Sequence, residues 1–245
     1  MRSTSWACCT RRSAEPCTVR TMRLAHRESG SPEAPPLVLL HGLTSDGTAW
    51  DAVAAHFATR HRVLVPDLRG HGRSPHPGTY SFELMRDDVL ALLDELALPS
   101  VGLIGHSLGG VVAYLLASRH PARVTRLVLE ETPPPIPLDL PSPQRPSGPL
   151  GYDWAARPAI VHRLNAPDPA WWDALPGITV PTLVVAGGEE SHLPQQAIAA
   201  MADRFPAGRL VTIPAGHRVH VLRPREFCAA VEEFLSTSQP TPPAS

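Results

Sequence analysis

The motif Gly-His-Ser-Leu-Gly at residues 105–109 constrains this chain more than any other stretch. An apolar run, residues 101–104, precedes the motif, and a helix-forming run, residues 110–118, follows it. A strand that turns this sharply into a helix needs glycine on both sides of the serine, because a Cβ there would meet neighbouring backbone. The pattern predicts that the Ser107 hydroxyl stands above the end of a sheet. The alternative is a glycine-rich turn with an incidental serine.

Short apolar segments alternate with helical segments along the rest of the chain. The predicted strands cover residues 37–40, 62–65, 101–104, 124–129, 182–186 and 209–213. The predicted helices cover residues 49–58, 82–96, 110–118, 194–205 and 224–235. Such alternation indicates parallel βα units, whose buried strands need helices on both faces. We therefore expect an α/β fold, a three-layer sandwich around a mostly parallel central sheet of about eight strands.

One domain is expected at residues 22–236, with tails on both sides. Residues 1–21 lack any periodicity, whereas Met22 begins a segment that continues smoothly into the domain. We therefore expect a disordered extension before a native start at Met22. The proline-rich residues 237–245 are expected to be a disordered tail.

Residues 132–181 interrupt the alternation, because their prolines prevent a continuous helix. Two short helices are predicted there, at about residues 154–164 and after Asp168, which can cap a helix that begins with Pro169. The segment is thus a short insertion rather than a second domain.

Composition excludes several functional classes. A net charge of −1 gives no reason to expect a nucleic acid or a charged membrane surface as partner. No apolar run approaches the length of a membrane span or of a signal-peptide core, which favours a cytoplasmic protein. The four cysteines, Cys8, Cys9, Cys17 and Cys228, show neither a disulfide framework nor metal-ligand spacing. A small-molecule substrate is the expected partner, and the protein is expected to be a monomer or homodimer.

From about residue 22 to residue 235 the chain resembles the α/β-hydrolase superfamily. Four motifs carry the resemblance, in the order in which that family has them: His41-Gly42 as oxyanion loop, residues 67–74 as the Asp-x-x-Gly-x-Gly-x-Ser loop, residues 105–109 as nucleophile elbow, and Gly216-His217 as the histidine position. The insertion at residues 132–181 lies where the family places its lid.

The resemblance implies a serine nucleophile, a histidine base and an acid. A serine hydroxyl needs a neighbouring base, so Ser107 must be paired with one of the 12 histidines. His217 is the expected base, because it follows the last strand and comes last in the family's chain order. His220 is expected to cap or cover the last helix, His41 to hold its own loop, and His106 to point away from Ser107.

The acid stays open between two glutamates. Judged by its distance from Gly187 and Pro194, Glu190 occupies the family's acid position after the strand that follows the lid. Glu131, with Glu130 beside it, ends the strand before the lid, where some relatives carry the acid. We take Glu190 as first choice and Glu131 as alternate, with Glu130 or no acid as the remaining cases.

The remaining polar and aromatic residues of note are given these roles. The backbone N–H groups of Leu43 and Leu108 are expected to form the oxyanion hole. Asp67 is expected to hold a structural turn, and Asp88 to be solvated on its helix. The lid tryptophans either pack or line an acyl pocket.

These residues predict a serine hydrolase that cleaves a small or medium apolar carboxylic ester through an acyl-enzyme, without cofactor or metal. Thioester cleavage, lactone opening, acyl transfer, C–C bond hydrolysis and lyase chemistry stay open within the same fold. The alternative from another class is a ligand-binding module without hydrolytic activity, because a fold does not determine a function.

Overall fold

The computed structural model describes residues 21–237 of the 245-residue chain. The predicted extension, except residue 21, and the predicted tail, except residue 237, lie outside the described residues. The native start expected at Met22 is likewise not tested by the structure.

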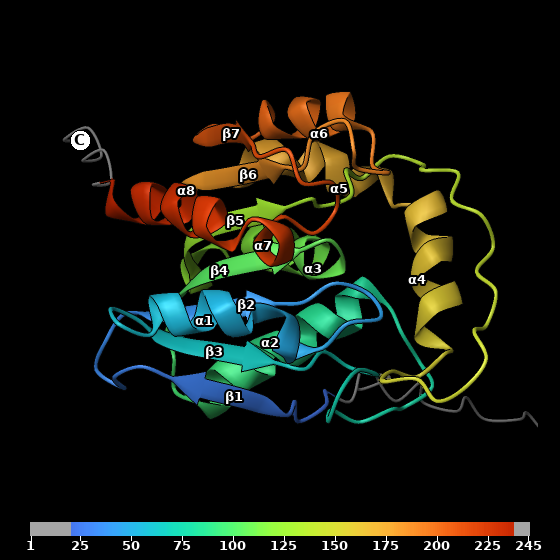
Figure 1. Cartoon of the computed structure of the whole chain (residues 1–245), viewed down its shortest axis with the longest axis horizontal. Coiled ribbons are helices and arrows are strands. Elements are labelled where there is room, and N and C mark those ends of the chain that lie inside the picture. The colour runs from blue at the N-terminus through green and yellow to red at the C-terminus, as the bar shows by residue number, and fades with distance from the viewer. Residues whose placement is uncertain (1–20, 238–245) are drawn as a thin grey trace, which may run out of the picture.

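Seven strands of the described chain form one sheet in the order β1-β3-β2-β4-β5-β6-β7 (Figure 1). They are β1 His26–Ser29, β2 Pro36–Leu40, β3 Arg62–Pro66, β4 Val101–His106, β5 Val124–Glu130, β6 Thr182–Ala186 and β7 Gly208–Thr212. β1 pairs with β3 in antiparallel register, and every other pair is parallel. The mostly parallel sheet is confirmed, with seven strands in the described chain where about eight were expected.

Helices cover both faces of the sheet. They are α1 Asp51–Phe57, α2 Phe82–Glu95, α3 Leu108–Arg119, α4 Ala156–Asn165, α5 Pro169–Ala174, α6 Gln195–Ala202, α7 Val219–Leu222 and α8 Pro224–Ser236. Figure 1 shows α1 and α8 in front of the sheet and α2 and α3 behind it. No helix within residues 21–237 is both long enough and apolar enough to cross a bilayer.

Strand β2 shows why the buried strands of this sheet have continuous apolar sequences. Val38 and Leu40 belong to the core cluster that contains residues of α2, α3 and α6. Leu37 and Leu39 belong to the other cluster, formed with residues of α1 and α8. Because successive side chains of a strand point to opposite faces, both sets must be apolar when helices cover both faces.

Two helix starts follow the predicted capping chemistry. The Ser81 side chain accepts a hydrogen bond from the Leu84 N–H at the start of α2. The Asp168 side chain accepts one from Ala170, with Pro169 at the first position of α5. Each cap satisfies an amide that has no partner inside its helix.

The insertion at residues 132–181 places α4 beyond the carboxyl ends of the parallel strands (Figure 1). Its two adjacent tryptophans pack against neighbouring side chains. Trp171 lies edge-on to Phe82 of α2, with the ring centroids 5.7 Å apart. The Arg204 guanidinium lies 5.4 Å from the ring centroid of Trp172. The structure thus shows packing contacts for this pair, one of the two roles that the sequence left open.

Candidate active site

Loops after four parallel strands bring the predicted residues to one edge of the sheet. Leu43 follows β2, Ser107 follows β4, Glu131 follows β5 and His217 follows β7. β2 lies between β3 and β4 in the sheet. The chain therefore adds β3 on one side of β2 and then adds β4 and the later strands on the other side. Open α/β sheets bind ligands at the carboxyl ends of their strands beside such a switch point.

The turn at Ser107 has the backbone that the sequence predicts. Ser107 has φ +50° and ψ −114°, a conformation that a non-glycine residue seldom adopts. A Cβ on Gly105 would lie 2.4 Å from the Gly109 carbonyl oxygen. A Cβ on Gly109 would lie 2.3 Å from the Leu40 carbonyl oxygen. Glycine on both sides is therefore what lets strand, serine and helix meet in so little space.

Ser107 and His217 line the same two hollows. The larger, of about 470 Å³, extends beneath α4 and is bounded there by Ile160 and Leu164. The smaller, of about 290 Å³, lies toward α7 and reaches Val221. The structure therefore brings the predicted nucleophile and the predicted base to one accessible space.

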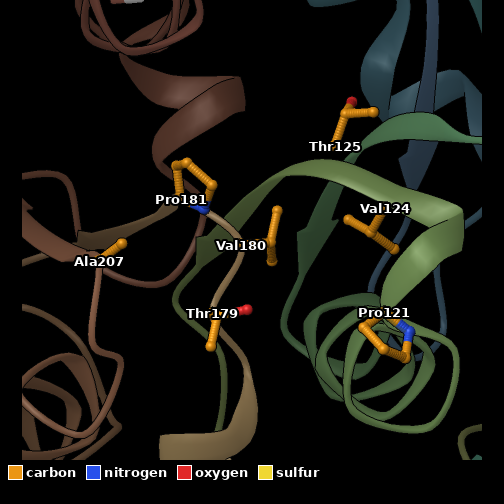
Figure 2. A pocket seen from close by; sticks show the side chains of 7 residues that line it. All are labelled: Pro121, Val124, Thr125, Thr179, Val180, Pro181 and Ala207. Atoms are coloured by element: carbon orange, nitrogen blue, oxygen red, sulfur yellow. The ribbon is translucent and has the colours of Figure 1, made fainter. Parts of the chain in front are cut away.

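A further hollow lies at the opposite edge of the sheet, near the amino ends of β5, β6 and β7 (Figure 2). Its volume is about 340 Å³, and its lining is Pro121, Val124, Thr125, Thr179, Val180, Pro181 and Ala207. No titratable side chain is among these residues. This hollow therefore offers no acid, base or charged group.

The acid beside His217 is Glu131. The His217 Nδ1 donates a hydrogen bond to the Glu131 Oε2 over 3.2 Å. The Glu131 side chain is fully buried and also accepts hydrogen bonds from the Gly187 N–H at 2.5 Å, the Gln195 side chain at 3.1 Å and the Ser191 hydroxyl. Glu131 has φ +45°, which turns the chain out of β5 at this point.

Glu190, our first choice for the acid, does not reach His217. Glu190 is exposed, and its side chain makes no hydrogen bond or ion pair within residues 21–237. The loop that carries Glu190 contributes in another way, since the Gly187 N–H and the Ser191 hydroxyl of that loop bind Glu131. The family spacing located the correct loop, but the carboxylate at His217 comes from the end of β5.

Burial alone would raise the pKa of Glu131. The hydrogen bonds from His217, Ser191, Gly187 and Gln195 outweigh it, so the pKa of this carboxyl lies below its ordinary value. Glu131 is therefore ionised at neutral pH and accepts a hydrogen bond from the N–H at His217 Nδ1. The other ring nitrogen, Nε2, is left with its lone pair for a proton from a hydroxyl.

The loop after β2 is held by two buried histidines. His41 Nδ1 donates to the Gly42 carbonyl at 2.8 Å, and its Nε2 accepts from the Leu68 N–H at 2.9 Å. His71 Nε2 accepts from the Thr44 N–H at 3.3 Å. His41 plays the expected role. His71, in the loop at residues 67–74, is fully buried as well, and burial lowers its pKa to about 3.

Two residues that line the site have backbone N–H groups without a partner in the described chain. Within residues 21–237, neither the Leu43 N–H nor the Leu108 N–H donates a hydrogen bond to another group. The Leu108 N–H opens the 12-residue helix α3, whose N-terminus favours negative charge. Both residues also line the larger hollow with Ser107.

A second carboxylate–histidine pair lies directly behind the first, and sequence reasoning missed it. The buried Glu130 accepts hydrogen bonds from the His220 N–H at 2.8 Å and from His220 Nδ1 at 2.9 Å. The Trp50 indole stacks on the His220 ring with the centroids 4.0 Å apart. His220 therefore anchors α7 to the end of β5, and its ring also lies edge-on to Phe227 of the last helix, with the centroids 6.3 Å apart. The signal available in the sequence was the adjacent pair Glu130 and Glu131.

His106 connects the two pairs. Its Nε2 donates to the His217 carbonyl oxygen at 2.7 Å, and its ring lies 4.8 Å from that of His220. Burial lowers the pKa of His106 to about 3, so the ring is neutral. Potential ligand atoms of His106, Glu130 and His220 lie within 4.8 Å of one another. Hydrogen bonds in this cluster use Glu130 Oε1 and His220 Nδ1, whereas Glu130 Oε2 and His220 Nε2 are buried without a hydrogen-bond partner in the described chain.

One further residue of the site was not predicted. His192, from the loop after β6, places its ring against His217 with the centroids 4.2 Å apart. It also lines the larger hollow. Burial and the neighbouring His217 lower the pKa of His192, although Glu131 opposes the shift. No local pattern in the sequence distinguishes this histidine from a loop histidine.

The loop at residues 67–74 is structural, as predicted. Asp67 accepts hydrogen bonds from the Gly47 N–H at 2.8 Å and the Arg73 N–H at 3.0 Å. Asp88 was expected to be solvated, and this prediction is wrong. Its fully buried carboxylate pairs with Arg69 at 2.6 Å and 2.8 Å, because α2 turns this side toward the loop rather than toward solvent.

Comparison with known proteins agrees with this geometry. The family model described as alpha/beta hydrolase fold matches residues 35–165. This chain belongs to the α/β-hydrolase fold family. The predicted family, fold class and hydrolase class of this enzyme are thereby confirmed.

Individual relatives cover most of this α/β hydrolase. The sn-1-specific diacylglycerol lipase ABHD11 of Mus musculus is 29% identical over 257 residues, which cover 84% of this chain and 83% of the relative. The 2-hydroxymuconate semialdehyde hydrolase of Pseudomonas sp. is 29% identical over 245 residues, which cover 82% of this chain and 87% of the relative. A solved hydrolase from Pseudomonas aeruginosa is 28% identical, with a TM-score of 0.78 over 88% of this chain and 95% of that one.

Proposed function

We propose that this α/β hydrolase cleaves small or medium apolar carboxylic esters, or related acyl compounds, through an acyl-enzyme on Ser107. The observation that carries the proposal is the Glu131–His217 hydrogen bond, which orients His217 in the hollow that Ser107 also lines. The names of the relatives, a lipase among them, support hydrolysis of an acyl bond.

Each step is given to a residue of the site. The Ser107 oxygen attacks the ester carbonyl while His217 Nε2 takes the hydroxyl proton. The same proton then goes to the departing alcohol. A water molecule, activated in turn by His217, releases the acid and restores Ser107.

Glu131 is the acid in this mechanism. A buried carboxylate keeps the proton on His217 Nδ1 and stabilises the imidazolium formed during attack. Its four hydrogen-bond donors hold it in one orientation. Glu190, which makes none of these contacts, has no part in catalysis.

The N–H groups of Leu43 and Leu108 bind the oxyanion of the tetrahedral intermediate. Because neither has another partner in the described chain, both are free to donate when negative charge develops on the substrate oxygen. Removing one such donor typically costs roughly 100- to 1,000-fold in turnover.

The size of the larger hollow supports a small or medium acyl group. Its volume of about 470 Å³ lies in the range of pockets that hold small molecules. The side chains of Leu140, Ile160, Leu164 and Leu193 give it apolar walls. A chain that outgrows this space would have to displace α4.

Two measurements test the proposal. A fluorophosphonate probe should modify wild-type protein at Ser107, as located by peptide mass spectrometry, and Ser107→Ala should remain unmodified. Rapid mixing with p-nitrophenyl hexanoate should release about one equivalent of p-nitrophenol in a burst, if deacylation is the slower step. Folded wild-type protein that gives neither an adduct nor turnover would instead indicate a non-hydrolytic binding protein.

A further inference from the structure

We propose that the natural substrate carries a carboxylate, and that Arg157 on α4 binds it inside the larger hollow. The substrate class is then an ester of a dicarboxylic acid with one free carboxyl group. This inference rests on the proposed function, because it names the substrate of that same site.

Arg157 is the charged residue of the larger hollow. It lines that space together with Ser107 and His217. No aspartate or glutamate lines either this hollow or the smaller one beside it. Apart from histidines, Arg157 carries the only ionisable side chain among the lining residues of the larger hollow. The wall therefore presents a positive charge without a carboxylate opposite it.

The guanidinium of Arg157 has no partner in the described part of the chain. It makes no ion pair, hydrogen bond or ring contact there, and the residue is half-buried. The second arginine of α4 is the contrast. Arg163 pairs with Glu83 at 3.1 Å and lies 5.1 Å from the ring centroid of Trp171. One arginine of the helix therefore holds α4 in place, whereas the other is available to a ligand.

The rest of the site does not neutralise this charge. Glu131 is buried behind His217, where four hydrogen bonds stabilise its negative charge. The smaller hollow adds a second cation, Arg218, which likewise has no ion pair within the described residues. A substrate that brings an anion into this space gains attraction, and a neutral one of equal size does not.

The geometry favours a carboxylate at the far end of an apolar chain. Ser107 and the two free N–H groups lie at the carboxyl ends of the strands, and Arg157 belongs to α4, which Figure 1 shows beyond those ends. Between them the walls include Ile160 and Leu193, which suit methylene groups. The planar fork of a single guanidinium matches the two oxygens of a carboxylate, and partial burial strengthens that pairing.

The test compares two esters of equal acyl length, mono-p-nitrophenyl adipate and p-nitrophenyl hexanoate. The measured quantity is the ratio of kcat/KM for the charged ester to kcat/KM for the neutral one. Arg157→Gln should lower this ratio about 10- to 100-fold, the usual loss for a hydrogen bond to a charged group. Arg157→Lys should retain part of the preference, because it keeps the charge and loses the planar fork. Added salt should lower the ratio in the wild-type enzyme.

Arg119→Gln is the matched control. Arg119 is an exposed arginine at the last turn of α3, whose first turn lies at Ser107, so roughly 17 Å of helix separate it from the site. The Arg119→Gln variant should have the same ratio of kcat/KM values for the two esters as the wild type. The inference is overturned if Arg157→Gln leaves the ratio unchanged, or if the wild type hydrolyses the neutral ester and rejects the charged one. Failure of the wild type on both esters would instead overturn the proposed function.

Discussion

Glu130 and Glu131 are consecutive residues whose carboxylates accept hydrogen bonds from two different histidines. Glu130 accepts from His220 and Glu131 from His217, so the end of β5 anchors two segments that follow β7. His106 joins them by donating to the His217 carbonyl. The catalytic histidine of the proposed mechanism is thus held both at its ring and at its backbone.

Replacing the acid should separate the two candidate glutamates. Glu131→Gln should lower kcat for p-nitrophenyl hexanoate by about four powers of ten, because the amide no longer holds the proton on His217 Nδ1. Glu190→Gln, in the exposed position, should stay within about twofold of the wild type. Losses of equal size in the two variants would contradict the assignment of Glu131.

The buried Glu130–His220 pair should stabilise the fold in a pH-dependent way. Burial raises the pKa of Glu130, but electrostatic attraction to His220 and the hydrogen bonds from His220 lower it below its ordinary value. A carboxyl with a lowered folded-state pKa stabilises the protein above its unfolded pKa, and this contribution is lost as pH falls through the folded value. Glu130→Gln should therefore reduce the free energy of unfolding by about 1–3 kcal/mol at pH 7.

The wild-type advantage over Glu130→Gln should shrink below about pH 4.5, the ordinary pKa of a glutamate. Urea unfolding between pH 7 and pH 3.5 measures it. Glu189→Gln, at an exposed residue, should show no such trend. A difference between wild type and Glu130→Gln that stays constant down to pH 3.5 would refute the lowered pKa.

The glycine at position 105, in the turn that carries Ser107, should not tolerate a side chain. Gly105→Ala places a methyl group 2.4 Å from the Gly109 carbonyl oxygen, so strand and helix must separate. The free energy of unfolding should fall by about 1–3 kcal/mol, the usual cost of overpacking. In Gly177→Ala the new Cβ has no neighbour within 4 Å, so urea unfolding should show a change of at most about 0.5 kcal/mol. Equal stabilities for the two variants would contradict the close approach.

The buried ion pair between Arg69 and Asp88 should be sensitive to loss of one partner. Asp88→Ala leaves a buried guanidinium without its carboxylate and should cost about 3–5 kcal/mol in unfolding free energy. Its neighbour Asp87 pairs with Arg86 near the surface, so Asp87→Ala should cost less than about 1 kcal/mol. Thermal or urea unfolding of both variants measures the difference. A small effect at Asp88 would mean that this carboxylate is not buried in solution.

Local patterns of the sequence predicted much of the fold. The apolar strands, the caps at Ser81 and Asp168 and the glycines around Ser107 all act over a few residues. One feature was less local: the order of the motifs placed His217 at the same sheet edge as Ser107, since parallel strands end at one edge. The residue-level predictions that succeeded are those whose physical cause lies within one element and its adjoining turn.

The sequence by itself thus determined the α/β layers, the strained serine and the histidine that lines the same hollows as this serine. Only the tertiary structure decided which carboxylate reaches that histidine, and that Asp88 and His71 are buried. The reason is physical: a side chain at the end of a strand contacts residues 50 or more positions away, such as Glu131 with Gly187. Which of two nearby carboxylates makes such a contact depends on how the loops pack, and no local periodicity encodes that packing.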